Sequence, residues 1–217
     1  ILYAWYLGEQ GGNALAEIIF GDRSPSGKLP FTIPMSSNKL PDYINYSMKD
    51  RTYRYLESTP MYPFGFGLSY SKFNYSDVSL SEVFKQRDKI VTASLQVQNI
   101  SDTDAEEVIQ LYITQPESDQ ISPKFTLKQF KRVSLASGEE KTLKFKINSE
   151  MLESFNIDGS TKLELGTYKI TIGNSSPGSR SKELGAFLVT KELGAFWIKE
   201  HKIRNRVKYH NNAYQIT

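Results

Sequence analysis

The chain has 217 residues, of which 39% are hydrophobic and 24% charged, a balance typical of a folded protein rather than a disordered one. No apolar run approaches the ~20 residues that a membrane-spanning helix needs. The net charge is only +3, and residues 197–217 account for it with five basic residues against one acidic residue. The near-neutral remainder therefore indicates neither a nucleic-acid partner nor a membrane partner.

Cysteine is absent, and both histidines, His201 and His210, lie close to the C-terminus. The body of the chain therefore has no disulfide, no thiol nucleophile and no histidine for a catalytic triad or a zinc site. The residue types predict no cofactor and no metal site.

Four Asn-x-Ser/Thr sequons are candidate glycosylation sites, at Asn45, Asn74, Asn99 and Asn174. Such sequons matter only in a secretory compartment. Residues 1–7 lack the basic region and the cleavage site of a signal peptide, which carries no information about targeting if the true N-terminus lies upstream of Ile1.

Residues 1–7 form a continuous apolar run that ends at a glycine, which predicts a strand buried on both faces. Residues 13–20 predict a helix with one apolar face and Gly21 as its C-cap, and residues 29–33 predict a second strand. A single strand–helix–strand unit cannot bury its own apolar faces. We therefore interpret residues 1–35 as the C-terminal remnant of an α/β domain whose body is not in this chain.

Residues 36–72 are rich in Pro, Gly, Ser and Tyr and predict a linker that packs on neighbouring domains. From residue 73 the hydrophobic period becomes two, and turn signals separate the alternating runs. About seven short strands in residues 73–190 predict a mainly β fold, an immunoglobulin- or fibronectin III-like sandwich without its disulfide. Tyr168, at the start of a late strand, is a candidate for the tyrosine corner of such a sandwich.

The hexapeptide KELGAF occurs twice, at residues 182–187 and 191–196. The first copy fits a final edge strand, and the second has no obvious place in the sandwich. A tandem duplication and an error in the sequence both remain open as its origin. Residues 191–217 are expected to form a disordered basic tail, with an interaction arm as the alternative.

The glycine-rich stretch GEQGGN at residues 8–13 lacks the pattern of a phosphate-binding loop. The amides of Gly11 and Gly12 could meet a ligand oxygen at a helix start, but a tight turn with close packing is favoured. Glu9 is the carboxylate with the best neighbourhood for chemistry, but a carboxylate placed at the helix start because the helix dipole favours it there is the preferred interpretation.

SDTDAEE at residues 101–107 resembles half a calcium loop, but the ligand spacing is incomplete. A polar hairpin turn that runs into an edge strand is favoured. A retaining glycosidase needs two carboxyl groups about 5–5.5 Å apart, and no pair in this sequence has that character.

RTYRY at residues 51–55 combines arginines with tyrosines. Arg51, Tyr53 and Arg54 are weak candidates for substrate binding, because arginine pairs with carboxylates and tyrosine stacks on sugar rings. The favoured alternative is that they fasten the linker to a neighbouring domain.

Several stretches together resemble glycoside hydrolase family 3. The end of its α/β sandwich domain is similar to AWYLGEQGGNALAEIIFGDRSPSGKLPFTIP, and its linker to YSMKDRTYRYLESTPMYPFGFGLSYSKFNYS. Its fibronectin type III-like domain is similar to VQNISDTDAEEVIQLYI, LKQFKRVSLASGEEKTLKFKI and GTYKITIGNSS. The resemblance is ordered along the chain and runs from residue 1 to about residue 190.

The resemblance implies the C-terminal part of a retaining exo-β-glycosidase, secreted or lysosome-like, that acts on β-xylosides or β-glucosides. In this family the nucleophile is an Asp of an N-terminal barrel, and the acid/base is a Glu upstream of the glycine-rich stretch. Neither motif is present, so no catalytic residue is assigned, and Leu7 and Gln10 depart from the family pattern around Glu9. The alternative is a non-catalytic module that binds a glycan or a protein.

Overall fold

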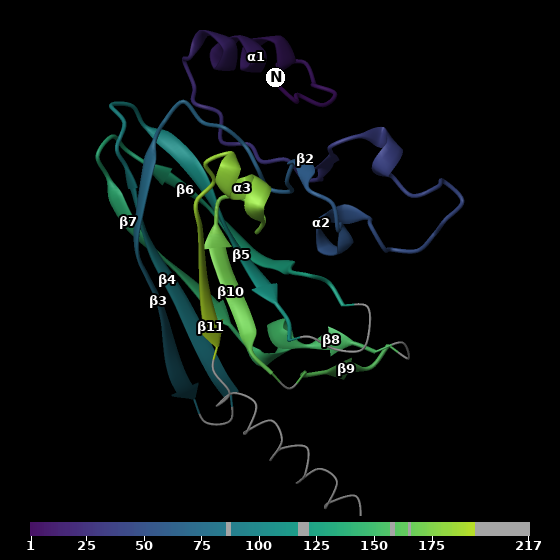
Figure 1. The fold of residues 1–217 in the computed structure, drawn as a ribbon. Coiled ribbons are helices and arrows are strands. Elements are labelled where there is room, and N and C mark those ends of the chain that lie inside the picture. Colours follow the sequence, from purple (N-terminus) through teal and green to yellow (C-terminus); the bar gives the residue numbers. More distant parts are fainter. Residues whose placement is uncertain (86–87, 117–121, 157–158, 165, 194–217) are drawn as a thin grey trace, which may run out of the picture.

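Two antiparallel β-sheets that pack face to face dominate the computed structural model, which describes residues 1–85, 88–116, 122–156, 159–164 and 166–193 (Figure 1). One sheet has the strand order β3-β4-β7 and the other β11-β10-β5-β6. Their bounds are β3 Phe73–Lys85, β4 Asp88–Asn99, β5 Ala105–Thr114, β6 Thr126–Leu135, β7 Glu140–Ile147, β10 Tyr168–Gly173 and β11 Leu188–Leu193. Seven strands in two sheets confirm the predicted mainly β sandwich.

The core of the sandwich follows from the alternation of apolar and polar residues along the strands. The strands β4, β5, β7 and β10 send every second side chain inward, and the buried set includes Val91, Ala93, Leu95, Ile109, Leu111, Ile113, Phe145, Ile147, Ile170 and Ile172. The strand that begins after SDTD was expected at an edge of the sheet, and this expectation was wrong. β5 lies between β10 and β6 and is paired on both sides, which agrees with its nearly continuous burial from Ile109 to Ile113.

Tyr168 begins β10 and is 1% exposed. Its hydroxyl donates a hydrogen bond to the backbone carbonyl of Glu164 at 3.0 Å. A buried tyrosine that bonds back to the chain a few residues upstream is the tyrosine corner of these sandwiches, so the prediction for Tyr168 is confirmed.

The end of the sandwich differs from the expectation for the KELGAF repeat. The first copy ends the short helix α3 (Ser179–Glu183), and Gly185, with φ of 78°, follows its end. The last strand, β11, begins only at Leu188 and takes in the first three residues of the second copy. Glycine closes the helix because a left-handed residue costs it little. The rest of the second copy and the basic tail fall outside the described residues.

The N-terminal region contains one regular helix, α1 (Gly11–Phe20), which begins two residues before the predicted start. Gly21 has φ of 85° and donates its N–H to the carbonyl of Ile18, so the predicted C-cap is confirmed. The predicted strand at residues 1–7 was wrong, because this segment has no partner strand among the described residues and its side chains are largely exposed. Tyr3, Trp5 and Phe31 instead contact one another edge to face.

The second predicted strand is shorter and shifted. β1 (Ile33–Pro34) pairs antiparallel with β2 (Pro60–Tyr62) of the linker, with Ile33 opposite Tyr62 and Pro34 opposite Pro60. The remaining elements are η1 Ser37–Lys39, α2 Thr52–Tyr55, η2 Ser149–Leu152, β8 Ser154–Phe155 and β9 Thr161–Lys162. No helix among the described residues is long and apolar enough to cross a membrane.

The linker packs closely on the sandwich at Gly65. The side-chain amide of Gln110 donates to the Gly65 carbonyl at 3.0 Å, and the Gln110 carbonyl oxygen accepts from the Tyr112 hydroxyl. Gly65 has φ of 76°, and a Cβ there would overlap the Gln110 side chain. Only glycine therefore fits this contact, which fixes residues 60–67 between the N-terminal segment and β5.

Candidate functional site

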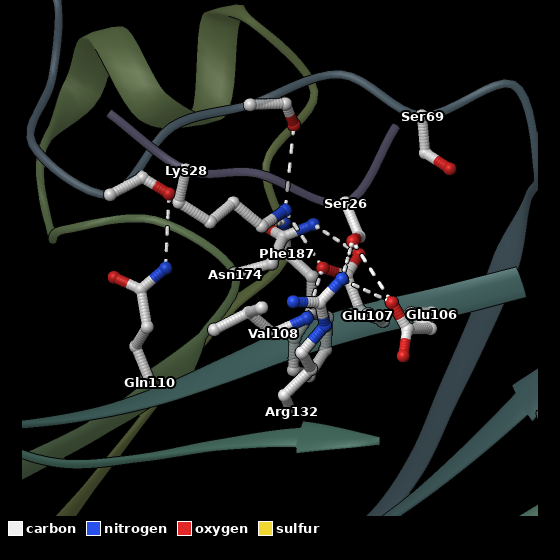
Figure 2. A network of polar contacts seen from close by, with 12 residues as sticks. Ser26, Lys28, Ser69, Glu106, Glu107, Val108, Gln110, Arg132, Asn174 and Phe187 are labelled. Atoms are coloured by element: carbon white, nitrogen blue, oxygen red, sulfur yellow. Dashed lines mark hydrogen bonds and ion pairs between the residues drawn. The ribbon is translucent and has the colours of Figure 1, made fainter. Parts of the chain in front are cut away.

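A buried carboxylate, Glu107, lies at the start of β5 on the face that carries the core residues. Only 3% of it is exposed, and its Oε1 lies 2.7 Å from Nζ of Lys28. The Lys28 and Glu107 side chains are 10% and 4% exposed. Burying an unpaired charge is expensive, so each group depends on the other (Figure 2). Lys28 thus anchors the N-terminal segment at the end of the sandwich core.

The second oxygen of Glu107 joins the two sheets. Oε2 accepts hydrogen bonds from the Tyr75 hydroxyl of β3 at 2.9 Å and from the Asn174 amide at 3.4 Å. The Tyr75 ring stacks on Phe187 with ring centroids 4.3 Å apart. Burial, and then the charge of Glu107, raise the pKa of Tyr75 far above its usual value. Tyr75 therefore remains a neutral hydrogen-bond donor to Glu107 near neutral pH.

The neighbouring carboxylate, Glu106, faces the opposite side of β5 and reaches the same N-terminal segment. It pairs with Arg132 of β6 and accepts hydrogen bonds from Ser134 at 3.1 Å and Ser26 at 3.3 Å. Partial desolvation opposes ionisation of Glu106, but the hydrogen bonds from Arg132 and Ser134 hold its pKa below the usual value. Arg132 also donates to the Ser26 hydroxyl at 2.8 Å. The Arg132–Glu106 ion pair thus holds the loop before Lys28 through Ser26 (Figure 2).

A cleft of about 600 Å³ opens beside this clamp, between the N-terminal loop and the rim of the sandwich. Its charged lining residues are Asp22, Arg23, Asp104, Glu106, Arg132, Glu139 and Lys141. Most of these charges are already neutralised, as in the pairs of Arg23 with Glu17 at 2.6 Å and Lys141 with Glu139 at 2.9 Å. The cleft is a polar seam between two packed parts of the chain.

The three candidate substrate-binding residues make different contacts in the structure. Arg51 closes the loop before it, because its guanidinium donates to the carbonyls of Asp42, Asn45 and Ser47. Tyr53 stacks on Phe64 at 4.3 Å and accepts the N–H of Leu127. The Arg54 guanidinium lies 5.7 Å from the Tyr55 ring.

These contacts support the alternative in which the RTYRY stretch fastens the linker, here to the sandwich of the same chain. The carbonyl of Arg54 accepts the N–H of Lys124 at 2.8 Å, which adds a backbone link to the loop before β6. Tyr53 lines a cavity of about 250 Å³, and neither arginine does. A role for Arg51, Tyr53 and Arg54 in substrate binding stays a prediction.

The four sequon asparagines differ in accessibility. Asn45 and Asn74 are exposed, whereas Asn99 is fully buried and donates both amide hydrogens, to the carbonyls of Thr103 and Leu135. Asn174 is half-buried and bonded to Tyr75 and Glu107. The folded chain therefore presents Asn45 and Asn74 for modification, and glycosylation at these two positions stays a prediction.

The glycine-rich stretch shows packing and no ligand geometry. A Cβ at Gly11 would overlap the side chain of Leu7, which agrees with the close-packing interpretation. Glu9 is exposed just before α1. No cluster of His, Cys, Asp or Glu that could hold a metal ion is present in the described part of the chain, and both histidines lie outside it.

Sequence reasoning overlooked Lys28 and Glu107. A signal for Glu107 was present, since it occupies an inward position in the alternating series Ala105, Glu107, Ile109, Leu111. A charge in the apolar phase of a strand indicates a buried partner. The identity of that partner was not readable, because Lys28 comes from a loop that is distant in the sequence.

Comparison with known families gives two matches in chain order. Residues 1–70 match the glycosyl hydrolase family 3 C-terminal domain, and residues 107–176 match the fibronectin type III-like domain. The junction around Glu107 joins the two matched regions, since Lys28 belongs to the first and Glu107 begins the second.

Similar proteins are β-glycosidases. A putative beta-xylosidase of Formosa agariphila is 42% identical over 81% of this chain, and a periplasmic beta-glucosidase of Salmonella typhimurium is 39% identical over 81%. The chain spans 24% and 25% of the length of these relatives. Among solved structures, the beta-glucosidase of Bifidobacterium adolescentis is 33% identical with a TM-score of 0.71, and the match covers 87% of this chain and 29% of that one.

Proposed function

This chain belongs to glycoside hydrolase family 3, and on that basis we propose that it is the C-terminal part of a retaining exo-β-glycosidase that hydrolyses β-xylosides or β-glucosides. The observation that carries the proposal is the ordered pair of family matches. The relatives include a beta-xylosidase and a beta-glucosidase, so in this proposal the sugar released from the substrate is xylose or glucose.

In this proposal the chain supplies a structural module, and the nucleophile and the acid/base lie outside it. The two carboxylates of its polar junction support this division, because Glu106 and Glu107 face opposite sides of β5 and each is paired with a cation. A retaining enzyme needs two carboxyl groups that face one glycosidic bond. Paired carboxylates on opposite faces cannot perform that reaction.

An apolar surface at the N-terminal end also supports the proposal. Leu2, Tyr6, Ile19 and Phe20 are exposed on α1 and the segment before it. A concentration of exposed large apolar side chains on one segment suggests a surface that another part of the protein covers. The proposed cover is the remainder of the α/β domain, which the junction at Lys28 would hold in a fixed orientation.

An extracytoplasmic location is part of the proposal. One relative is named as periplasmic, and Asn45 and Asn74 are exposed sequons. The substrate of the whole protein would be a β-linked oligosaccharide or glycoside.

The test compares the 217-residue chain with a longer polypeptide that includes the region encoded upstream of Ile1. Aryl β-xyloside and aryl β-glucoside are the substrates. The longer protein is expected to hydrolyse one of them, and the chain alone to hydrolyse neither. Turnover by the chain alone would contradict the structural role, and an inactive longer protein would favour the non-catalytic binding module.

A further inference from the structure

A small cavity lies where the N-terminal segment, the linker and the sandwich meet. Its volume is about 250 Å³, and Thr32, residues 56–60, the loop at Lys124 and residues 176–181 contribute to its lining. α2, β2 and α3, which carry or flank these residues, gather at the same end of the molecule (Figure 1). All three parts of the chain must be in place for the cavity to exist.

The charged groups of this cavity cancel one another. Nζ of Lys124 lies 2.9 Å from the carboxylate of Glu57. The guanidinium of Arg180 lies 3.1 Å from the carboxylate of Glu183. Arg180 also donates from Nε to the carbonyl of Met61 at 3.2 Å. Since each cation has its own carboxylate, the cavity does not select an anion. Its remaining donors and acceptors suit a neutral polar molecule.

The lining hydroxyls of Ser58, Thr59 and Ser179 have no hydrogen bond to another described residue, and the buried hydroxyl of Thr32 also lacks such a partner. Each hydroxyl can donate one hydrogen bond and accept two. The backbone that carries Ser179 is held in place, because Ser181, fully buried, donates from its hydroxyl to the carbonyl of Ser176 at 2.6 Å. The hydroxyl of Ser179 is therefore presented to the cavity from a backbone that is held in place.

Two aromatic residues also contribute to the lining. Tyr53 and Phe125 both line the cavity, and their rings lie 5.8 Å apart at an interplanar angle of 30°. A binding site that combines an apolar aromatic wall with a few convergent polar groups is typical for a small molecule with one apolar and one polar side. A pyranose sugar has this character, since its ring C–H groups are apolar and its hydroxyls radiate outward.

We propose that this cavity binds one neutral pyranose, with Phe125 and the edge of the Tyr53 ring against its C–H groups and the serine and threonine hydroxyls of the lining bonded to the sugar hydroxyls; the faces of Tyr53 are already stacked on Phe64 and Phe125. The volume equals that of about eight liquid water molecules, which is enough for a single sugar ring. The choice of xylose or glucose as that sugar rests on the proposed function. The proposal that the cavity binds a pyranose does not.

The test is a titration of the 217-residue chain with xylose, glucose and their methyl β-glycosides, followed by NMR and calorimetry. Binding of at least one of them in the millimolar range is expected, because a single sugar offers few contacts. Ser179→Tyr should fill the cavity and weaken binding more than about tenfold. Lys182→Tyr is the matched control, since Lys182 is exposed on the same helix and does not line the cavity.

A milder pair of variants guards against loss of folding. Ser58→Ala and Thr59→Ala each remove one hydroxyl and should weaken binding about threefold to tenfold. Absence of binding at saturating sugar, or equal affinity of Ser179→Tyr and Lys182→Tyr, would overturn the proposal. These outcomes are independent of catalysis, because hydrolysis by the longer polypeptide tests the proposed function separately.

Discussion

Replacing Lys28 with Met is expected to destabilise the chain strongly, because it leaves the buried carboxylate of Glu107 without its cation. The two side chains are 10% and 4% exposed and their charged atoms lie 2.7 Å apart. Removing one partner of a buried ion pair typically costs about 3–5 kcal/mol. Val108, Tyr75 and Asn174 still donate hydrogen bonds to the carboxylate, so we expect the lower end of this range, about 3 kcal/mol.

For a chain of this size each kcal/mol lowers the melting temperature by about 2–4 °C, so the expected shift of Lys28→Met is about 6–12 °C. Urea unfolding followed by circular dichroism measures the free energy directly. Lys169→Met is the control, because Lys169 and Glu192 form an exposed pair 3.9 Å apart and such pairs contribute less than about 1 kcal/mol.

The double variant Lys28→Met/Glu107→Gln separates the loss of charge pairing from the loss of packing. Removal of both charges should restore most of the stability, since the neutral amide no longer needs a cation. A loss below about 1 kcal/mol for Lys28→Met, or no recovery in the double variant, would refute the view that Lys28 neutralises Glu107.

Three further predictions address other positions. Asn99→Ala should cost about 1–3 kcal/mol in urea unfolding, since it leaves the buried carbonyl of Leu135 without this donor and removes the bond to the carbonyl of Thr103, and mass spectrometry of the chain from a glycosylating host should find no glycan at Asn99. Tyr168→Phe should cost about 1 kcal/mol through loss of the hydrogen bond to Glu164, and an unchanged melting temperature would count against the tyrosine corner. Because Arg132 helps to hold the pKa of Glu106 below its usual value, Glu106 contributes stability above its unfolded-state pKa that is lost as the pH falls through the lower folded-state pKa. Arg132→Gln should therefore weaken the pH dependence of stability on the acid side, as thermal melts across that range would show.

The sandwich was predictable because its signal is local and repeated. Alternation along each strand indicates which side chains enter the core, as it does for Ile109, Leu111 and Ile113 and for Ile170 and Ile172, even where the residues between them are buried on the other face. Tyr168 was predictable for a similar reason, since its partner is a backbone carbonyl only four residues away.

The N-terminal region was predicted less well because its structure depends on partners that a local pattern does not reveal. Residues 1–7 have the composition of a buried strand, but a strand needs a neighbour to hydrogen-bond with, and none is present among the described residues. β1 formed at Ile33, where the linker offers Tyr62 as a pairing partner. Ile33 lies two residues beyond the centre of the predicted strand at residues 29–33. The residue types of these segments favour strands, but the available pairing partner determined where a strand formed.

The polar junction shows the same limit at the level of side chains. Glu106 and Glu107 are adjacent, so the pleat of β5 sends them to opposite faces of the sheet. Both nevertheless contact the segment from Ser26 to Lys28, one through an exposed clamp and the other through a buried pair. Two contacts on opposite sides of one strand resist rotation of that segment in a way that one contact cannot. This geometry explains why a non-catalytic sandwich would carry a costly buried charge: it fixes the orientation of the α/β segment on which, in our proposal, the rest of the enzyme is assembled.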